Sequence, residues 1–154
     1  LLRPFSTHKP TEIIMAPKVY GFDTGFICHA KGRTELRTED VGFMWEHCIL
    51  NEMHGQLQMR SIHYWRDKSG HEIDFVLRSK QNNATTAIEC KFLVHHDDAT
   101  LSVLIKNFEA FRRLYPNGEN FVVASNVDKP FKRRQDDIAL SFVSAQDLIK
   151  NLKD

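Results

Sequence analysis

Hydrophobic residues recur at helical spacing in two long segments of the chain. They are Val41, Met44, Trp45, Cys48, Ile49 and Met53 in one, and Leu101, Leu104, Ile105, Phe108, Phe111 and Leu114 in the other. Spacings of three and four residues place such side chains on one face of a helix. We therefore predict a helix over about 40–54, capped by Thr38-Glu39-Asp40 and ended at Gly55, and a second over about 100–115. A third, closing helix is expected over 145–152.

Shorter hydrophobic runs between these helices indicate strands. We predict strands over 61–66, 71–78, 86–94, 121–125 and 138–143, and a short one within 18–23. Asp67-Lys68-Ser69-Gly70 is a turn sequence, and residues 31–39, 79–85 and 129–137 are polar enough to predict loops. The resulting order is helix, three-strand meander, helix, strand. It predicts an α/β domain with a mixed sheet, whose antiparallel meander is flanked by helices.

The second and third strands of this meander each carry one apolar face. Ile73, Phe75 and Leu77 alternate with Glu72, Asp74 and Val76, and Ile88, Cys90 and Phe92 alternate with Ala87, Glu89 and Lys91. In a hairpin the apolar faces must coincide, and a turn centred between Gln81 and Asn82 achieves this. That register pairs Phe75 with Ile88 and sets Asp74 opposite Glu89, with Cβ atoms about 4.5–5.5 Å apart. It also sets Glu72 opposite Lys91.

The same reasoning gives a register for the first hairpin of the meander. A turn centred on Lys68-Ser69 pairs Ile62 with Phe75 and Tyr64 with Ile73, which sets His63 opposite Asp74. The apolar pattern alone therefore brings together two acids, with Lys91 beside them on the same face.

Two adjacent carboxylates repel each other unless a positive charge lies between them. A hard divalent cation such as Mg²⁺, or Mn²⁺, fits this role and also binds phosphate oxygens. Lys91, two residues beyond Glu89, has the position to orient an attacking water or to neutralise a phosphate oxygen. This set of groups predicts metal-assisted phosphodiester hydrolysis.

Ordered motifs along the chain strengthen this interpretation. They are Lys18-Val19-Tyr20-Gly21-Phe22-Asp23-Thr24-Gly25, Gly42-Phe43-Met44-Trp45-Glu46, the run from Tyr64 to Phe75, and Ile88-Glu89-Cys90-Lys91. Asp74 followed by Glu89-Cys90-Lys91 resembles the PD-(D/E)XK nuclease superfamily, with its restriction-endonuclease-like fold. The whole set is similar to the C-terminal domain of a large group of prokaryotic AAA-type ATPases of unknown function. Ile73 stands where the superfamily name has proline, a common departure.

The resemblance implies a site, a domain layout and a partner. Asp74, Glu89 and Lys91 become the nuclease-like triad, with Asp74 and Glu89 as metal ligands. Residues 1–17 become an extended lead-in from an N-terminal ATPase module, which would hold the ATP, and residues 18–154 become the nuclease-like domain.

A carboxylate from the first long helix is expected to complete the metal site, and two residues qualify. Glu46 stands where the family pattern has one. Glu52 lies nearer the apolar stripe, about 20° from Val41 on a helical wheel. Both remain candidates.

Composition narrows the function further. The 154 residues fit one domain, and 21 Lys+Arg against 20 Asp+Glu give a formal net charge of +1. Nucleic-acid binding is therefore expected to be weak and to depend on a local basic run, Lys129, Lys132, Arg133 and Arg134. No apolar run has the length of a membrane span, and three cysteines without metal spacing favour reduced thiols in a cytoplasm. Besides a nuclease, the chain fits a noncatalytic module for regulation, assembly or nucleic-acid docking of its ATPase, with its oligomeric state left open.

Overall fold

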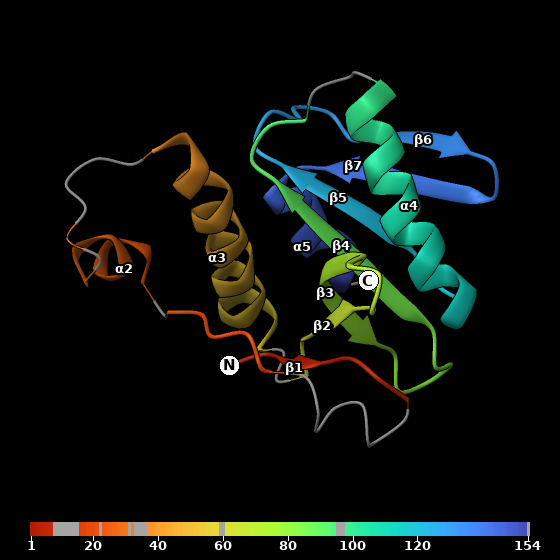
Figure 1. The fold of residues 1–154 in the computed structure, drawn as a ribbon, viewed down its shortest axis with the longest axis horizontal. Coiled ribbons are helices and arrows are strands. Elements are labelled where there is room, and N and C mark those ends of the chain that lie inside the picture. Colours follow the sequence, from red (N-terminus) through yellow and green to blue (C-terminus); the bar gives the residue numbers. More distant parts are fainter. Residues whose placement is uncertain are drawn as a thin grey trace.

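The computed structural model describes residues 1–7, 16–21, 23–30, 32, 37–58, 61–94 and 98–153. Most of the loop expected over 31–39, and part of the expected lead-in, lie outside these ranges. Within them the strands are β1 (Arg3–Pro4), β2 (His63–Arg66), β3 (Glu72–Arg78), β4 (Thr85–Lys91), β5 (Asn120–Ala124), β6 (Phe131–Gln135) and β7 (Ile138–Val143). The helices are α2 (Thr24–Ala30), α3 (Thr38–Leu57), α4 (Asp98–Leu114) and α5 (Ala145–Lys153) (Figure 1).

The strands form one mixed sheet in the order β1-β2-β3-β4-β5-β7-β6. Strands β2, β3 and β4 are the predicted antiparallel meander, and β5 lies parallel to β4 after the crossover through α4. Strand β7 is parallel to β5, so the mixed sheet predicted from the sequence is confirmed.

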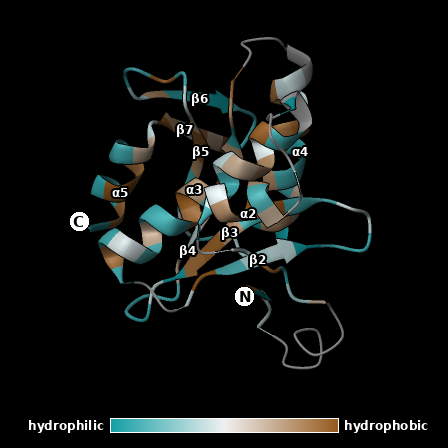
Figure 2. Ribbon diagram, turned by 90° about the vertical axis from the view of Figure 1, so that its left-hand side faces the viewer, coloured by the Kyte–Doolittle hydropathy of each residue, from teal (hydrophilic) through white to brown (hydrophobic). Residues whose placement is uncertain are grey.

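Helices cover both faces of the sheet. On one face, Leu104, Phe108 and Phe111 of α4 pack against Val76 and Val122. On the other face, α3 and α5 pack on the sheet through Ile49, Leu50, Met53, Leu148 and Ile149, against Phe75, Ile88 and Val123. Strands at the centre of the sheet, such as β4 and β5, carry hydrophobic residues, whereas the edge strand β6 is hydrophilic and teal in Figure 2. The helical periodicity of the sequence therefore identified most of both helix–sheet interfaces, although Cys48 and Leu114, expected on these faces, are exposed and Leu50 was missed.

The hairpin that carries the acidic pair has the predicted register. Phe75 pairs with Ile88 and Leu77 with Thr86, and both Phe75 and Ile88 belong to the core on the α3 side. Strand β4 ends at Lys91, three residues before the predicted end.

The first hairpin differs from its prediction. Trp65, rather than Tyr64, pairs with Ile73, and His63 pairs with Val76 instead of Asp74. The Asp67 carboxylate accepts hydrogen bonds from the backbone N–H groups of Ser69 (2.8 Å) and His71 (2.9 Å), which closes a loop one residue longer than expected.

A register shift between β2 and β3 follows this loop. Because of it, the Ile73 side chain lies on the opposite face of the sheet from the one predicted. Ile73 packs in the core on the α4 side, whereas Phe75 and Leu77 pack on the α3 side. The expectation that all three share one face is therefore wrong. Such irregularities change the direction in which side chains point, and this one lies directly beside Asp74.

Three further sequence predictions need correction. The expected charged loop over 129–137 contains β6, an edge strand in which Phe131 stacks on Phe142 at 4.6 Å between ring centroids. Its exposed polar residues, visible along β6 in Figure 2, are what protects a sheet edge from further pairing.

Helix α3 continues through Gly55 to Leu57 and ends where Gln58 adopts a left-handed conformation, φ 49°. Helix α2 was not predicted, although Asp23 caps it by accepting a 2.6 Å hydrogen bond from the Phe26 N–H.

The residues around the expected domain boundary at 18 pack on the sheet. Strand β1 pairs in parallel with β2, and Leu2 and Phe5 are buried. Of the strand expected within 18–23, the described residues form an isolated bridge between Lys18 and Leu2. The described part of the expected lead-in therefore contributes an edge strand.

Candidate functional site

Asp74 on β3 and Glu89 on β4 form the centre of the candidate site. Continuing the observed register beyond the Phe75–Ile88 pair places these two acids opposite each other. Only 14% of the Asp74 side chain and 6% of the Glu89 side chain are exposed. The backbone N–H of Cys90 donates a 2.8 Å hydrogen bond to Asp74 Oδ2, which fixes this carboxylate against the neighbouring strand.

Burial raises the pKa values of both acids, and nearby negative charges add to the shift. Burial raises the pKa of Asp74 well above its usual range, and the charges of Glu89 and Glu46 raise it further. Burial also raises the pKa of Glu89, although its contact with Lys91 opposes the shift. Strongly raised carboxyl pKa values in close pairs are typical of catalytic and metal-binding sites.

Lys91 is in direct contact with Glu89. Its Nζ lies 2.7 Å from Glu89 Oε1. Burial lowers the pKa of Lys91, but the charge of Glu89, its hydrogen bond and the charge of Asp74 together outweigh burial, so the pKa is raised and the ammonium form is retained. The other oxygen, Glu89 Oε2, is buried and has no hydrogen-bond partner among the described residues.

The two helix carboxylates have different surroundings. Glu46 on α3 lies 3.4 Å from Lys18 Nζ and accepts a hydrogen bond from the Tyr20 hydroxyl. Glu52 is exposed. Burial raises the pKa of the Cys48 thiol, and the charge of Glu52 raises it further. Six residues separate the two acids, about 9 Å along a helix. The structure thus brings Glu46, and not Glu52, to Asp74.

Sequence reasoning missed two members of the cluster, Lys18 and Tyr20. Lys18 Nζ contacts Glu72 and Glu46 and lies 3.9 Å from Asp74. Glu72 contacts Lys18, and it also accepts a 2.7 Å hydrogen bond from Arg66 Nε. The sequence feature that could have identified Lys18 and Tyr20 is the motif over residues 18–25, which is part of the family resemblance.

His63, expected beside Asp74, is not part of the cluster. It pairs with Val76 across the strands, and its ring packs edge-on against Phe5, 5.8 Å between centroids. In the described ranges, no three His, Cys, Asp or Glu side chains already form a metal-binding group. The ammonium groups of Lys18 and Lys91 contact the carboxylates of the cluster.

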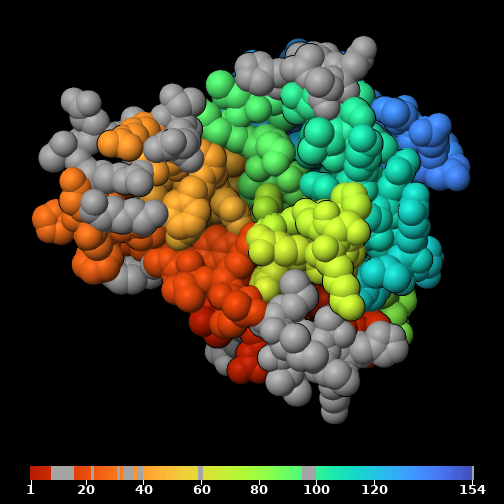
Figure 3. All heavy atoms as spheres, in the orientation of Figure 1, coloured from red at the N-terminus to blue at the C-terminus, as the bar shows by residue number. Residues whose placement is uncertain are grey.

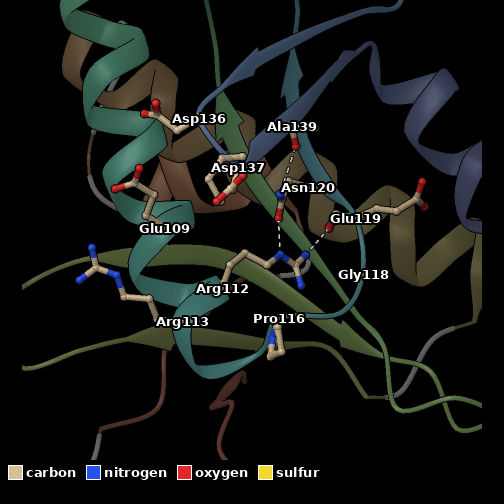
Figure 4. Close-up of a pocket in the computed structure, with 11 residues that line it drawn as sticks. Glu109, Arg112, Arg113, Pro116, Gly118, Glu119, Asn120, Asp136, Asp137 and Ala139 are labelled. Carbon is tan, nitrogen blue, oxygen red and sulfur yellow. Dashed lines mark hydrogen bonds between the residues drawn. The ribbon is translucent and has the colours of Figure 1, made fainter.

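A pocket of about 580 Å³ lies elsewhere, at the beginnings of β5 and β7 (Figure 4). Arg112 on its wall is buried, and burial lowers its pKa to about 10. Its guanidinium donates hydrogen bonds to Asn120 Oδ1 (2.7 Å) and to the carbonyl oxygens of Thr85 (3.0 Å) and Glu119 (2.7 Å). These bonds tie α4 to β4 and β5, so this arginine is structural.

Two broader findings concern the whole described chain. None of its helices combines the length and the hydrophobicity that crossing a membrane requires. Cys28, Cys48 and Cys90 are free thiols.

Comparison with known proteins identifies a family. No curated protein and no solved structure gives a significant match. A family described as a domain of unknown function (DUF4143), found at the C-terminus of AAA-ATPase-like proteins, matches residues 41–143. This range holds Glu46, Asp74, Glu89 and Lys91, and begins after Lys18 and Tyr20. Because the match covers about two thirds of the chain, the chain belongs to the DUF4143 family.

Proposed function

We propose that this domain is a divalent-metal-dependent phosphodiesterase that acts on DNA or RNA. Asp74, Glu89 and Glu46 bind the metal, and Lys91 acts on the scissile phosphate or its attacking water. The observation that carries the proposal is the buried pair Asp74 and Glu89, with pKa values raised by burial and, for Asp74, by the nearby negative charges. In a cluster of ion pairs that only stabilises the fold, the positive charges would equal the negative charges in number.

The charges of the cluster do not balance. Among the described residues, its carboxylates are Glu46, Glu72, Asp74 and Glu89, and the cations in contact with them are Lys18, Arg66 and Lys91. Within the described ranges, the acid that Arg66 contacts is Glu72, at the outer side of the cluster, where about half of the Arg66 side chain is exposed. The interior acids therefore keep an excess of negative charge, which a bound cation would offset.

The donor set fits Mg²⁺ or Mn²⁺. These ions take carboxylate oxygens as ligands, and Glu89 Oε2 is a buried carboxylate oxygen that lacks a hydrogen-bond partner in the described part of the chain. When bound, the ion supplies Lewis-acid stabilisation of the charge that develops on the phosphoryl group.

The remaining steps belong to the chain's own residues. Lys91, held as an ammonium on Glu89, donates hydrogen bonds to a phosphate oxygen or orients the attacking water. The Cys90 N–H holds Asp74 in place, so the acidic pair stays aligned across the two strands. The mixed sheet with an antiparallel meander flanked by helices supports the restriction-endonuclease-like fold that the resemblance implies.

Calorimetric titration of Mn²⁺, combined with cleavage of DNA and RNA substrates, tests this proposal. Asp74→Ala is expected to weaken Mn²⁺ binding at least about tenfold and to abolish cleavage, because it removes a central ligand. Glu46→Ala should weaken binding as well. Glu52→Ala is the matched control from the same helix and should change neither quantity.

Lys91→Ala separates binding from catalysis. It should abolish cleavage without weakening Mn²⁺ binding, since an ammonium is no ligand and its loss removes repulsion. Metal binding that survives Asp74→Ala unchanged would contradict the proposed ligands.

The second candidate function is a noncatalytic module that regulates, assembles or docks an AAA-type ATPase, in which ATP binds to the N-terminal module. The observation that favours it is the contact of Lys18 and Lys91 with the acids, which already neutralises much of the site. A domain that binds Mn²⁺ but leaves every DNA and RNA substrate intact, even when joined to its ATPase, would establish this alternative. Both proposals place the protein in the cytoplasm.

A further inference from the structure

The carboxylate cluster holds a cation of its own, Lys18. The ammonium group contacts Glu72, lies 3.4 Å from Glu46 Oε1 and 3.9 Å from Asp74 Oδ1. Only 23% of the side chain is exposed. These acids come from α3 and β3, so a single ammonium group joins the helix to the sheet at the centre of the site.

The segment over residues 16–21 is fixed to the domain at several points. Lys18 exchanges backbone hydrogen bonds with Leu2, at 2.8 and 3.0 Å, and the Tyr64 hydroxyl donates a 2.6 Å hydrogen bond to the Ala16 carbonyl. The Tyr20 ring packs on His47, 4.7 Å between centroids. In Figure 3 this orange-red segment lies between α3 and the yellow-green turn that joins β2 to β3. The contacts of residues 16–21 with the domain therefore hold Lys18 beside the acids.

A second observation concerns a carboxylate oxygen of the cluster that Lys18 does not reach. Glu89 Oε2 is buried and unpartnered within the described ranges, and the charge of Glu89 acts on Asp74. Lys18 does not satisfy this oxygen. A divalent cation coordinated by Glu89, Asp74 and Glu46 would satisfy it, and would share the last two acids with Lys18.

We propose that Lys18 and the divalent cation are alternative occupants of this carboxylate cluster, so that metal entry displaces the Lys18 ammonium from Asp74 and Glu46. The inference rests on the proposed function, since it uses the same metal ligands. Glu72 is the acid that keeps Lys18 nearby after displacement, because it contacts the ammonium and is not needed as a ligand. Lys18 thereby sets how tightly the site binds metal.

Titration of Mn²⁺ into the full 154-residue chain tests the proposal. Lys18→Met should bind Mn²⁺ about tenfold more tightly than wild type or better, because a competing positive charge within 4 Å of two ligands is removed. Lys18→Arg should stay near wild type. Arg66→Met removes a positive charge from Glu72 alone and is the matched control, with an expected change of less than about threefold.

The outcomes separate the two proposals. If neither wild type nor Lys18→Met binds Mn²⁺, the metal site and the proposed function are both wrong. If both bind equally, or if Arg66→Met tightens binding as much as Lys18→Met, only the displacement of Lys18 is overturned.

A measurement on wild type covers the case in which Lys18→Met does not fold. Acetylation of lysines, followed by mass spectrometry, reports how firmly each ammonium is held. Saturating Mg²⁺ should increase the labelling rate of Lys18 at least about threefold and leave that of Lys68, in the exposed β2–β3 turn, unchanged. An unchanged Lys18 rate under conditions where Mg²⁺ binds would overturn the inference.

Discussion

At the residue scale, the site is an arrangement of charges that folding brings together at a cost. The sequence allowed Asp74, Glu89 and Lys91 to be placed side by side, because strand alternation and one apolar register suffice for that. It did not allow Lys18 or Tyr20 to be placed there. Their contacts with Glu46 join residues 26 or more positions apart through a segment with no regular periodicity. Long-range contacts of irregular segments leave no such pattern.

The raised pKa of Asp74 makes a prediction about stability in the absence of metal. Asp74 holds a proton more readily in the folded than in the unfolded chain, so its contribution favours folding at low pH. That contribution is lost as the pH rises from about 4 through the raised folded pKa. At pH 7, Asp74→Asn should therefore stabilise the protein and raise its Tm. Thermal unfolding at pH 7 and pH 4 measures this, and the gain should shrink at pH 4.

Glu72→Gln is the control with the opposite sign. Burial alone would raise the pKa of Glu72, but its hydrogen bonds from Lys18 and Arg66 outweigh this and lower it. Its charge stabilises the fold above its ordinary pKa, and the effect is lost as the pH falls through the lowered folded value. Glu72→Gln should lower Tm at pH 7. A stabilised Glu72→Gln together with a destabilised Asp74→Asn would contradict the charge arrangement described here.

At the element scale, patterns of period 3.6 and 2 predicted the long helices and the central strands, and failed at edges. Strand β6 was predicted as a loop because the exposed edge carries Lys132 and Arg134, which hide the alternation of a strand. The shift between β2 and β3 was missed because the Asp67 side chain, and not hydrophobicity, determines that turn. Edge position and turn chemistry thus account for these errors.

The connection between α4 and β5 offers a prediction about stability. Gly118 has φ 128°, and a Cβ added there would lie 1.9 Å from the Thr85 carbonyl oxygen. Gly118→Ala should therefore cost about 3 kcal/mol or more, because it pushes this turn away from β4 and the Arg112 hydrogen bonds with it. Urea unfolding measures the loss.

Gly55 provides the matched control. It lies inside α3 with nothing within 4 Å of an added Cβ. Gly55→Ala should stabilise the protein by about 0.5–1 kcal/mol through improved helix propensity. A similar loss at both positions would contradict the close approach at Gly118.

At the scale of the whole molecule, the candidate site and the basic run occupy separate parts of the sheet. Asp74 and Glu89 lie on the central strands, whereas Lys132 and Arg134 lie on β6 at the edge, three strands from β4. With strands about 4.8 Å apart, the separation is roughly 14 Å. Because the net charge is only +1, we expect phosphate contacts to come from this local basic run.

This layout predicts weak, salt-dependent binding of nucleic acid. Fluorescence anisotropy with a labelled duplex at 50 and 200 mM salt should show affinity falling at least about tenfold, as a few phosphate contacts require. Replacing Lys132 and Arg134 together by alanine should weaken binding further at low salt. Tight binding that ignores salt would show that another surface recognises the nucleic acid.

The measurement that tests the central claim most directly is crystallographic. Crystals soaked in Mn²⁺ should show an anomalous peak within coordination distance, about 2.0–2.3 Å, of carboxylate oxygens of Asp74 and Glu89, with Glu46 turned toward it. Lys18 should no longer contact Asp74. Saturating Mn²⁺ that leaves no peak between these acids, with Lys18 and Lys91 still paired to them, would contradict the metal-dependent phosphodiesterase proposed here.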